Sequence, residues 1–397
     1  MTGRIICCLV ALLVVPSSFA QKKIINEARA YIKAGKDFDK AEKLMVGLLK
    51  KDSSNRENTK IYDTWFDAVE GQYEQANEKL YLKQKYDTAA FFGLTKRLYE
   101  IALTLDTLDA RPDAKGRVKL DYREDNSEKL NTLRPNLYFG GTYHIRKEQY
   151  RQAYDFFSYY LNAAQQPLFE RYHYATSDSR MPSAAYWATY CGYKLQDADM
   201  ALHFSQQALK DVSKAQFVLQ YMCEAYQQQK DEAKYLNTLQ EGFKRYPEYP
   251  YFFPRLADYY TAQGRSDSLL TIANEGLAVN EKNTLFLLAK SLALLNMERY
   301  EECTEVSKQL IALNDTLPEP YFNIATCYLN QALELEQSRG RKQRKQLQEL
   351  YSSARPYMED YRRLVPEDSK RWAPALYRIY LNLNMGKEFE EIDQLMK

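Results

Sequence analysis

A period of 34 residues is the feature that most constrains how this chain can fold. Five consecutive segments start 34 residues apart, at Pro182, Gln216, Pro250, Thr284 and Pro318. The eighth residue of each segment is small: Thr189, Cys223, Ala257, Ser291 and Ala325. Each segment also contains two helical patterns separated by a short polar break. The period therefore predicts stacked pairs of helices.

The composition agrees with a mostly helical chain. Gly and Pro number only 14 and 13 among 397 residues, and both are the usual breaks in helices. Mean hydropathy is −0.61 although 45% of the residues are hydrophobic, which suits a shape with much surface and a thin, continuous core. Tyr is abundant, at 34 residues, and can pack its ring while its hydroxyl stays hydrated.

The repeating unit resembles the tetratricopeptide repeat (TPR), a family whose unit is 34 residues and two antiparallel helices. The resemblance implies an all-α fold, a right-handed α-solenoid of antiparallel helix pairs. Looser units are marked by Phe38 with Ala41, by Tyr86 with Ala89, and by Phe389 with Ile392. The chain departs from the family pattern at unit position 20, which is Tyr235 and Leu269 in two central units. A helical-hairpin array of another repeat type is the alternative.

Two adjacent glycines, Gly140 and Gly141, interrupt a helical pattern at residues 136–146. Each costs about 1 kcal/mol relative to Ala in a helix interior. In the family register Gly141 takes the small position 8. We therefore expect both glycines to face a neighbouring helix and to let two helix axes approach closer than the usual 8–10 Å.

The first 20 residues have the pattern of a signal peptide. Arg4 precedes an apolar run from Ile5 to Val15, and Ser18-Phe19-Ala20 fits a cleavage site before Gln21. The apolar run is too short to span a bilayer, and its cysteines lie too early for a lipoprotein signal. The sequence thus predicts an exported protein, periplasmic or secreted. Cleavage would remove one basic residue from a net charge of +2, so nothing attracts the whole chain to nucleic acid.

Breaks in the period suggest the domain organisation. Residues 21–166 are predicted as an N-terminal array of TPR-like repeats, with an irregular polar insertion at 104–132 that could act as a joint. Residues 167–397 are predicted as a C-terminal array with an extended helical hairpin at 329–354. A second insertion, at 166–181, is rich in aromatic residues and loop formers. Insertions in repeat proteins are often used in binding.

The sequence contains no constellation typical of catalysis or metal binding. Its three histidines, His144, His173 and His203, are scattered and lack metal-site spacing. The carboxylates are interspersed with Lys and Gln, which is typical of solvated helix faces. We expect neither an enzyme nor a cofactor-binding or metal-binding protein.

Four cysteines follow the signal segment: Cys191, Cys223, Cys303 and Cys327. They are dispersed and form no C-x-x-C motif, so they are expected to be buried thiols in the core. Cys303 and Cys327 could pair if their helices are neighbours.

The family resemblance also implies where a partner would bind. Positions 2, 5, 9, 12 and 13 of each unit line the concave face, so the resemblance places a partner groove at these residues: Tyr138, Tyr186, Tyr190, Tyr193, Lys194, Gln220, Glu224, Gln227, Asp258, Leu288 and Leu292. Tyrosines offer large contact area at low entropic cost. They could equally be solvated or pack against the next unit. The Lys/Asn clamp with which some family members grip a C-terminal carboxylate is absent.

A basic run near the C-terminus is a further candidate. It could contact an anionic lipid or an acidic partner, or be a solvated hairpin tip, and it comprises Arg339, Arg341, Lys342, Arg344 and Lys345.

Two functional hypotheses follow. The first is a non-enzymatic scaffold of the bacterial cell envelope that binds a protein or peptide in the tyrosine-rich groove. The second is an exported carbohydrate-binding protein, because related repeats occur in glycan-capture lipoproteins and aromatic rings stack on sugars. Those lipoproteins are usually longer and carry a lipid-site cysteine, which this chain lacks.

Overall fold

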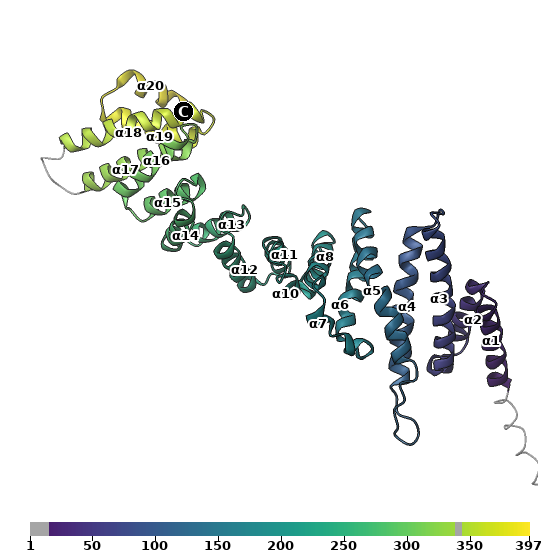
Figure 1. The fold of residues 1–397 in the computed structure, drawn as a ribbon. Coiled ribbons are helices and arrows are strands. Elements are labelled where there is room, and N and C mark those ends of the chain that lie inside the picture. Colours follow the sequence, from purple (N-terminus) through teal and green to yellow (C-terminus); the bar gives the residue numbers. More distant parts are fainter. Residues whose placement is uncertain (1–15, 338–343) are drawn as a thin grey trace, which may run out of the picture. The chain divides into compact units, whose positions relative to one another are not determined.

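The protein is all-α in the residues that its computed structural model describes, 16–337 and 344–397 (Figure 1). The predicted signal residues 1–15 and the basic residues Arg339, Arg341 and Lys342 lie outside these ranges. The chain forms two compact units, Met1–Glu232 and Ala233–Lys397.

The first unit is a succession of helices, each packed against the next along the chain. Its long helices are α1 (Pro16–Lys33), α2 (Phe38–Lys51), α3 (Thr59–Tyr81), α4 (Thr88–Asp109), α5 (Arg123–Arg146), α6 (Tyr150–Asn162), α8 (Met181–Lys194) and α11 (Ala215–Gln228). Shorter helical segments complete it: η1 (Ser53–Glu57), η2 (Ala163–Gln165), η3 (Pro167–Tyr172), α7 (Tyr174–Ser177), α9 (Ala198–His203) and α10 (Ser205–Ala208).

The second unit continues the same pattern. Its helices are α12 (Glu232–Arg245), which starts at the last residue of the first unit, then α13 (Phe252–Ala262), α14 (Ser266–Val279), α15 (Thr284–Asn296), α16 (Tyr300–Leu313), α17 (Pro318–Gln337), α18 (Arg344–Leu364), α19 (Ser369–Asn382) and α20 (Gly386–Leu395). Helix α17 has 20 residues and α18 has 21, whereas α15 and α16 have 13 and 14. These two helices include residues 329–337 and 344–354 of the hairpin predicted at 329–354, and the residues between them lie outside the described ranges.

The same left-handed backbone conformation recurs at the turn inside several helix pairs. Two residues after the first helix ends, the chain adopts a left-handed conformation, with φ between 53° and 66° at Glu148, Gln196, Lys230, Gly264, Glu298 and Asn384. This conformation ends a helix and reverses the chain. Among these six residues only Gly264 is a glycine, so the repeated turn is barely visible in the composition.

The two glycines of α5 are buried, as predicted, but the reason differs from the prediction. A Cβ on Gly140 would lie 2.7 Å from the Phe156 ring, and one on Gly141 would lie 2.6 Å from the Phe157 ring. The space is therefore occupied by aromatic rings of α6. True backbone contact occurs instead at Gly192, where a Cβ would lie 2.2 Å from the Ala201 backbone nitrogen.

The insertion predicted at 104–132 is shorter in the structure. Helix α4 continues to Asp109 and α5 begins at Arg123, so only residues 110–122 are irregular. Arg123 Nε donates to Asp106 Oδ1 at 2.7 Å, which ties the two ends of this loop together. The polar composition of the segment misled the prediction because charged residues here lie on helix ends.

The second predicted insertion, 166–181, packs against helices α5 and α6, which precede it in the chain. The guanidinium of Arg134 lies between the rings of Tyr160 and Tyr174, 3.7 and 3.8 Å from their centroids, and forms an ion pair with Asp178. Tyr160 also donates its hydroxyl to Asp178 Oδ2 at 2.5 Å. The aromatic residues Phe169 and Tyr174 are buried. They contribute to the core of the first unit and are not exposed for binding.

The boundary between the compact units differs from the predicted one. Helices α6 and α8, on either side of residues 166–167, pack directly on each other. The break in the sequence period therefore does not coincide with a break in packing, and the division falls at Glu232–Ala233.

The cysteines after the signal segment are buried free thiols, as expected. Cys303 on α16 and Cys327 on α17 belong to one hydrophobic cluster. The condition set for their pairing, neighbouring helices, is thus met, although the structure holds both as thiols.

Candidate functional site: a tyrosine cluster beside a polar pocket

Three predicted groove residues of α8 lie together with a tyrosine of α11. Tyr190 stacks on Tyr186 and approaches Tyr193, each at 6.4 Å between ring centroids. Tyr193 stacks on Tyr221 at 4.4 Å with an interplanar angle of 22°. These four residues, Tyr186, Tyr190, Tyr193 and Tyr221, are called the tyrosine cluster below. Aromatic pairs at these separations stabilise one another by roughly 0.5–1.5 kcal/mol beyond burial.

Tyr221 was not predicted as a site residue. It occupies position 6 of its unit, which lies outside the concave positions that the family resemblance implies. Helical spacing could have indicated it, because Tyr221 lies one turn before the predicted residue Glu224 and two turns before Gln228 on the same helix. Side chains at these spacings share one face of a helix.

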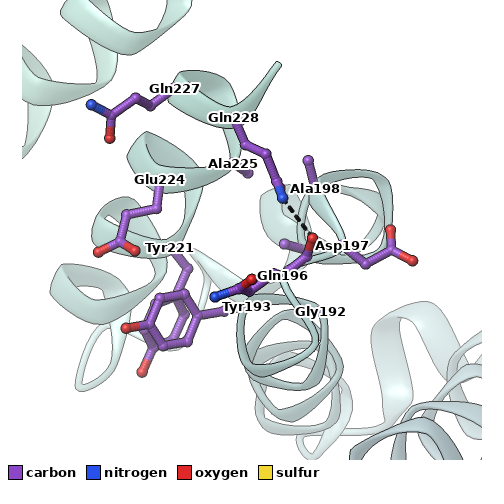
Figure 2. Close-up of a pocket in the computed structure, with 11 residues that line it drawn as sticks. Gly192, Tyr193, Gln196, Asp197, Ala198, Tyr221, Glu224, Ala225, Gln227 and Gln228 are labelled. Atoms are coloured by element: carbon purple, nitrogen blue, oxygen red, sulfur yellow. Dashed lines mark hydrogen bonds between the residues drawn. The ribbon is translucent and has the colours of Figure 1, made fainter. Parts of the chain in front are cut away.

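A pocket of about 270 Å³ opens beside the cluster (Figure 2). Its walls come from α8, α9, α11 and the α8–α9 turn, and its principal side chains are Tyr193, Gln196, Asp197, Tyr221, Glu224 and Gln227. Gln228 fixes one wall by donating its side-chain amide to the backbone oxygen of Gln196 at 2.6 Å. The pocket thus combines two aromatic rings with amide and carboxylate groups.

The two carboxylates of the pocket differ in their partners. Asp197 accepts a hydrogen bond from the backbone nitrogen of Met200 at 3.0 Å, which caps α9, and lies 3.6 Å from Arg151. Glu224 accepts one hydrogen bond, from Gln220 Nε2 at 3.4 Å. Within the part of the chain that the structure describes, Glu224 has no ion-pair partner. Only Glu224 is therefore available to a charged ligand.

The pKa values of the cluster reflect its partial burial. Burial raises the pKa of Tyr193, and the negative charge of Glu224 raises it further. Burial also raises the pKa of Tyr186 and that of Tyr221. All three hydroxyls are therefore neutral near pH 7 and offer hydrogen bonds without charge.

The remaining predicted groove residues of the first unit have other surroundings. Tyr138 is half-buried, and its hydroxyl lies 3.0 Å from Ser183 Oγ. Lys194 is exposed, with its Nζ 5.5 Å from the Tyr150 ring centroid. Gln220 is half-buried beside Glu224, and Gln227 is exposed at the rim of the pocket.

The other predicted site residues belong to the second unit. Asp258 is exposed, whereas Leu288 and Leu292 are half-buried. Leu288 packs against the hydrophobic cluster that contains Cys303 and Cys327. Of the basic run, Arg344 and Lys345 are exposed in the first turn of α18.

Two other kinds of feature are absent from the described residues. No group of three or more His, Cys, Asp or Glu side chains could hold a metal ion in these ranges. No described helix is both long and apolar enough to cross a membrane. His144 is buried and lies 2.7 Å from Gln149 Oε1 through its Nδ1.

Comparison with known proteins gives similarities of fold at low identity. No family model and no curated protein sequence matches the chain. The C-terminal part of a TPR repeat-containing protein from Cytophaga hutchinsonii is similar, with 12% identity over 64% of this chain and 92% of that chain and a TM-score of 0.42. Yeast Tom70 has 11% identity over 95% and 91%, with a TM-score of 0.32. The TPR domain of P58(IPK) has 12% identity over 92% and 99%, with a TM-score of 0.28.

Proposed function

We propose that this chain, built from helix pairs of the tetratricopeptide type, is a non-enzymatic scaffold that holds a protein or peptide segment at the tyrosine cluster of its first unit. The observation that supports this best is the position of Tyr193. Its ring contributes to the cluster and also lines the adjoining pocket, so one bound segment could contact both. Tyrosine is among the residues most enriched in the energetic centres of protein interfaces.

The alternative of a glycan-binding platform has weaker support. A sugar stacks on an open ring face, but the cluster's rings lie against one another. Tyr186 and Tyr221 are only 8% and 7% exposed. These two rings offer no open face to a pyranose, so a peptide segment that contacts mainly Tyr190 and Tyr193 suits the cluster better than a sugar.

We further propose that residues 1–20 direct export to the bacterial envelope and that cleavage leaves Gln21 at the N-terminus. Gln21 donates its side-chain amide to Asn55 Oδ1 at 2.6 Å, so the cleaved chain keeps this contact. N-terminal sequencing of the protein from periplasmic and extracellular fractions tests the proposal. A chain found only in the cytoplasm with residues 1–20 intact would contradict it.

The binding face is tested by affinity capture with the chain starting at Gln21. Tyr190→Ser with Tyr193→Ser should reduce recovery of the partner at least tenfold, because truncating a tyrosine at an interface centre costs about 2 kcal/mol. Tyr186 is left intact because it is buried. Tyr81→Ser is the matched control, since Tyr81 is 85% exposed on α3. Equal recovery of the partner by the double variant and the control would show that the partner does not bind at the tyrosine cluster.

A further inference from the structure

The lining of the pocket has one sign of charge. Asp197 and Glu224 contribute carboxylates, and among the described residues that line the pocket none is Lys or Arg. Asp197 is already satisfied by the α9 cap and by Arg151. Glu224 keeps a carboxylate with a single, long hydrogen bond. A half-buried carboxylate next to an aromatic ring favours a cation as its partner.

We propose that the pocket receives an arginine side chain of the bound segment, with Glu224 as the anionic partner and Tyr193 as the ring against which the guanidinium lies. This inference rests on the proposed function, because it names the residue that a partner must present.

The shape of the pocket favours a side chain over a free small molecule. Its volume of about 270 Å³ lies just below the range of roughly 300–1,000 Å³ typical of small-molecule sites. Arginine suits the lining because its planar guanidinium stacks on rings and binds a carboxylate through two parallel hydrogen bonds. The amides of Gln196 and Gln227 supply further acceptors at the wall and rim.

The neighbouring cations of the protein do not fill this role. The Nζ of Lys194 lies 5.5 Å from the Tyr150 ring, and that of Lys214 lies 5.9 Å from the Tyr186 ring. Arg151 faces Asp197. Each is thus placed on another side chain, and none forms an ion pair with Glu224 in the described ranges. Tyr221 stacks on one face of Tyr193, and the proposal places the guanidinium against the other face.

The probe is a display library of random 15-residue peptides, selected on the full chain starting at Gln21. Three proteins are compared: the unmodified chain, Glu224→Gln, and the matched control Glu78→Gln. Glu78 is an exposed carboxylate of α3, far along the chain from the pocket. Circular dichroism and a thermal melt establish that both variants fold as the unmodified chain does.

We expect the unmodified chain and Glu78→Gln to select peptides enriched in arginine at one position, and Glu224→Gln to lose that enrichment. Selected peptides without an arginine preference, or the same preference with Glu224→Gln, would overturn the inference and leave the scaffold function standing. Failure to select any peptide would overturn the proposed peptide scaffold together with the inference.

A titration of the best selected peptide makes the test quantitative. Glu224→Gln should weaken binding at least tenfold, since hydrogen bonds to a charged group contribute roughly 1.5–3 kcal/mol and each 1.4 kcal/mol is about a factor of ten. Replacing the peptide arginine by Lys should weaken binding less than replacing it by Gln. Equal weakening by Lys and Gln would mean that charge does not matter, and this would contradict the role of Glu224.

Discussion

At the scale of single residues, Gly192 is where the backbones of two helices meet. Adding one methyl group there places a Cβ 2.2 Å from the Ala201 backbone, which cannot rotate away as a side chain can. Gly192→Ala should therefore lower the free energy of unfolding by roughly 2–3 kcal/mol, at the upper end of overpacking effects. Urea denaturation followed by circular dichroism measures this loss.

Two other glycines serve as controls for that substitution. At Gly140 the nearest atoms belong to the Phe156 ring, which can shift, and Ala gains about 1 kcal/mol of helix propensity. Gly140→Ala should thus cost less than Gly192→Ala. Gly47, on α2, has no atom within 4 Å of the added Cβ, so Gly47→Ala should stabilise the chain by up to about 1 kcal/mol. The opposite order would show that close packing does not explain these glycines.

Asp67 on α3 gives the chain a pH dependence. Burial raises the pKa of Asp67 from 3.8 to about 6, and the charge of Asp63 adds to the rise while Lys129 and Arg29 oppose it. Since the folded pKa exceeds the unfolded one, the folded state binds more protons between these values. The free energy of unfolding therefore falls as pH rises from about 4 to about 6.

Asp67→Asn should remove that contribution and raise stability at pH 7.5 by roughly 1–2 kcal/mol, while changing it little at pH 4. Urea denaturation at the two pH values measures the difference. Asp39→Asn is the control, because Asp39 is exposed and its neighbour Lys43 lowers its pKa. If Asp67→Asn changed stability equally at both pH values, the burial of this carboxyl would not be the cause.

At the scale of elements, the left-handed turn described above recurs in six helix pairs with different residues. This conformation costs a non-glycine residue about 1–2 kcal/mol of steric strain in the folded state. Glycine has no such strain, but it loses more conformational entropy on folding. Glu298→Gly, at φ 60°, should therefore stabilise the second unit by roughly 0.5–1 kcal/mol. Gly264→Ala, at φ 66°, should destabilise it by a similar amount. Thermal melts of the two variants should shift in opposite directions, and shifts in the same direction would contradict this account.

At the scale of the whole molecule, a substitution that destabilises one helix pair should destabilise only the neighbouring pairs. The reason is that each helix packs mainly on those next to it in sequence. Gly192→Ala should accelerate amide hydrogen exchange in α8 and α9. Exchange in α16 and α17, in the other compact unit, should be unchanged. Mass spectrometry of exchanged fragments resolves both regions, and an equal acceleration throughout would indicate one cooperative structure.

The sequence by itself determined that the chain is all-α and built of helix pairs. The reason is local. A small residue recurs at the same position of each 34-residue unit, where the helices pack closely, and two examples, Ser291 and Ala325, are fully buried. The family resemblance also implied that Tyr186, Tyr190 and Tyr193 line one face, and in the structure their rings lie next to one another along α8.

Only the tertiary structure decided which residues complete the candidate site. Tyr221 joins the cluster through contacts between α8 and α11 that the pattern within one helix does not encode. Among the described residues, Glu224 has no ion-pair partner. The structure likewise showed that Arg134 anchors the 166–181 segment to α5 through Tyr174 and Asp178. Its aromatic residues and loop formers suggested a binding insertion, but Tyr174 and Asp178 satisfy the buried guanidinium of Arg134 instead. Such satisfaction depends on partners brought together from distant positions, and this is why sequence pattern alone does not reveal it.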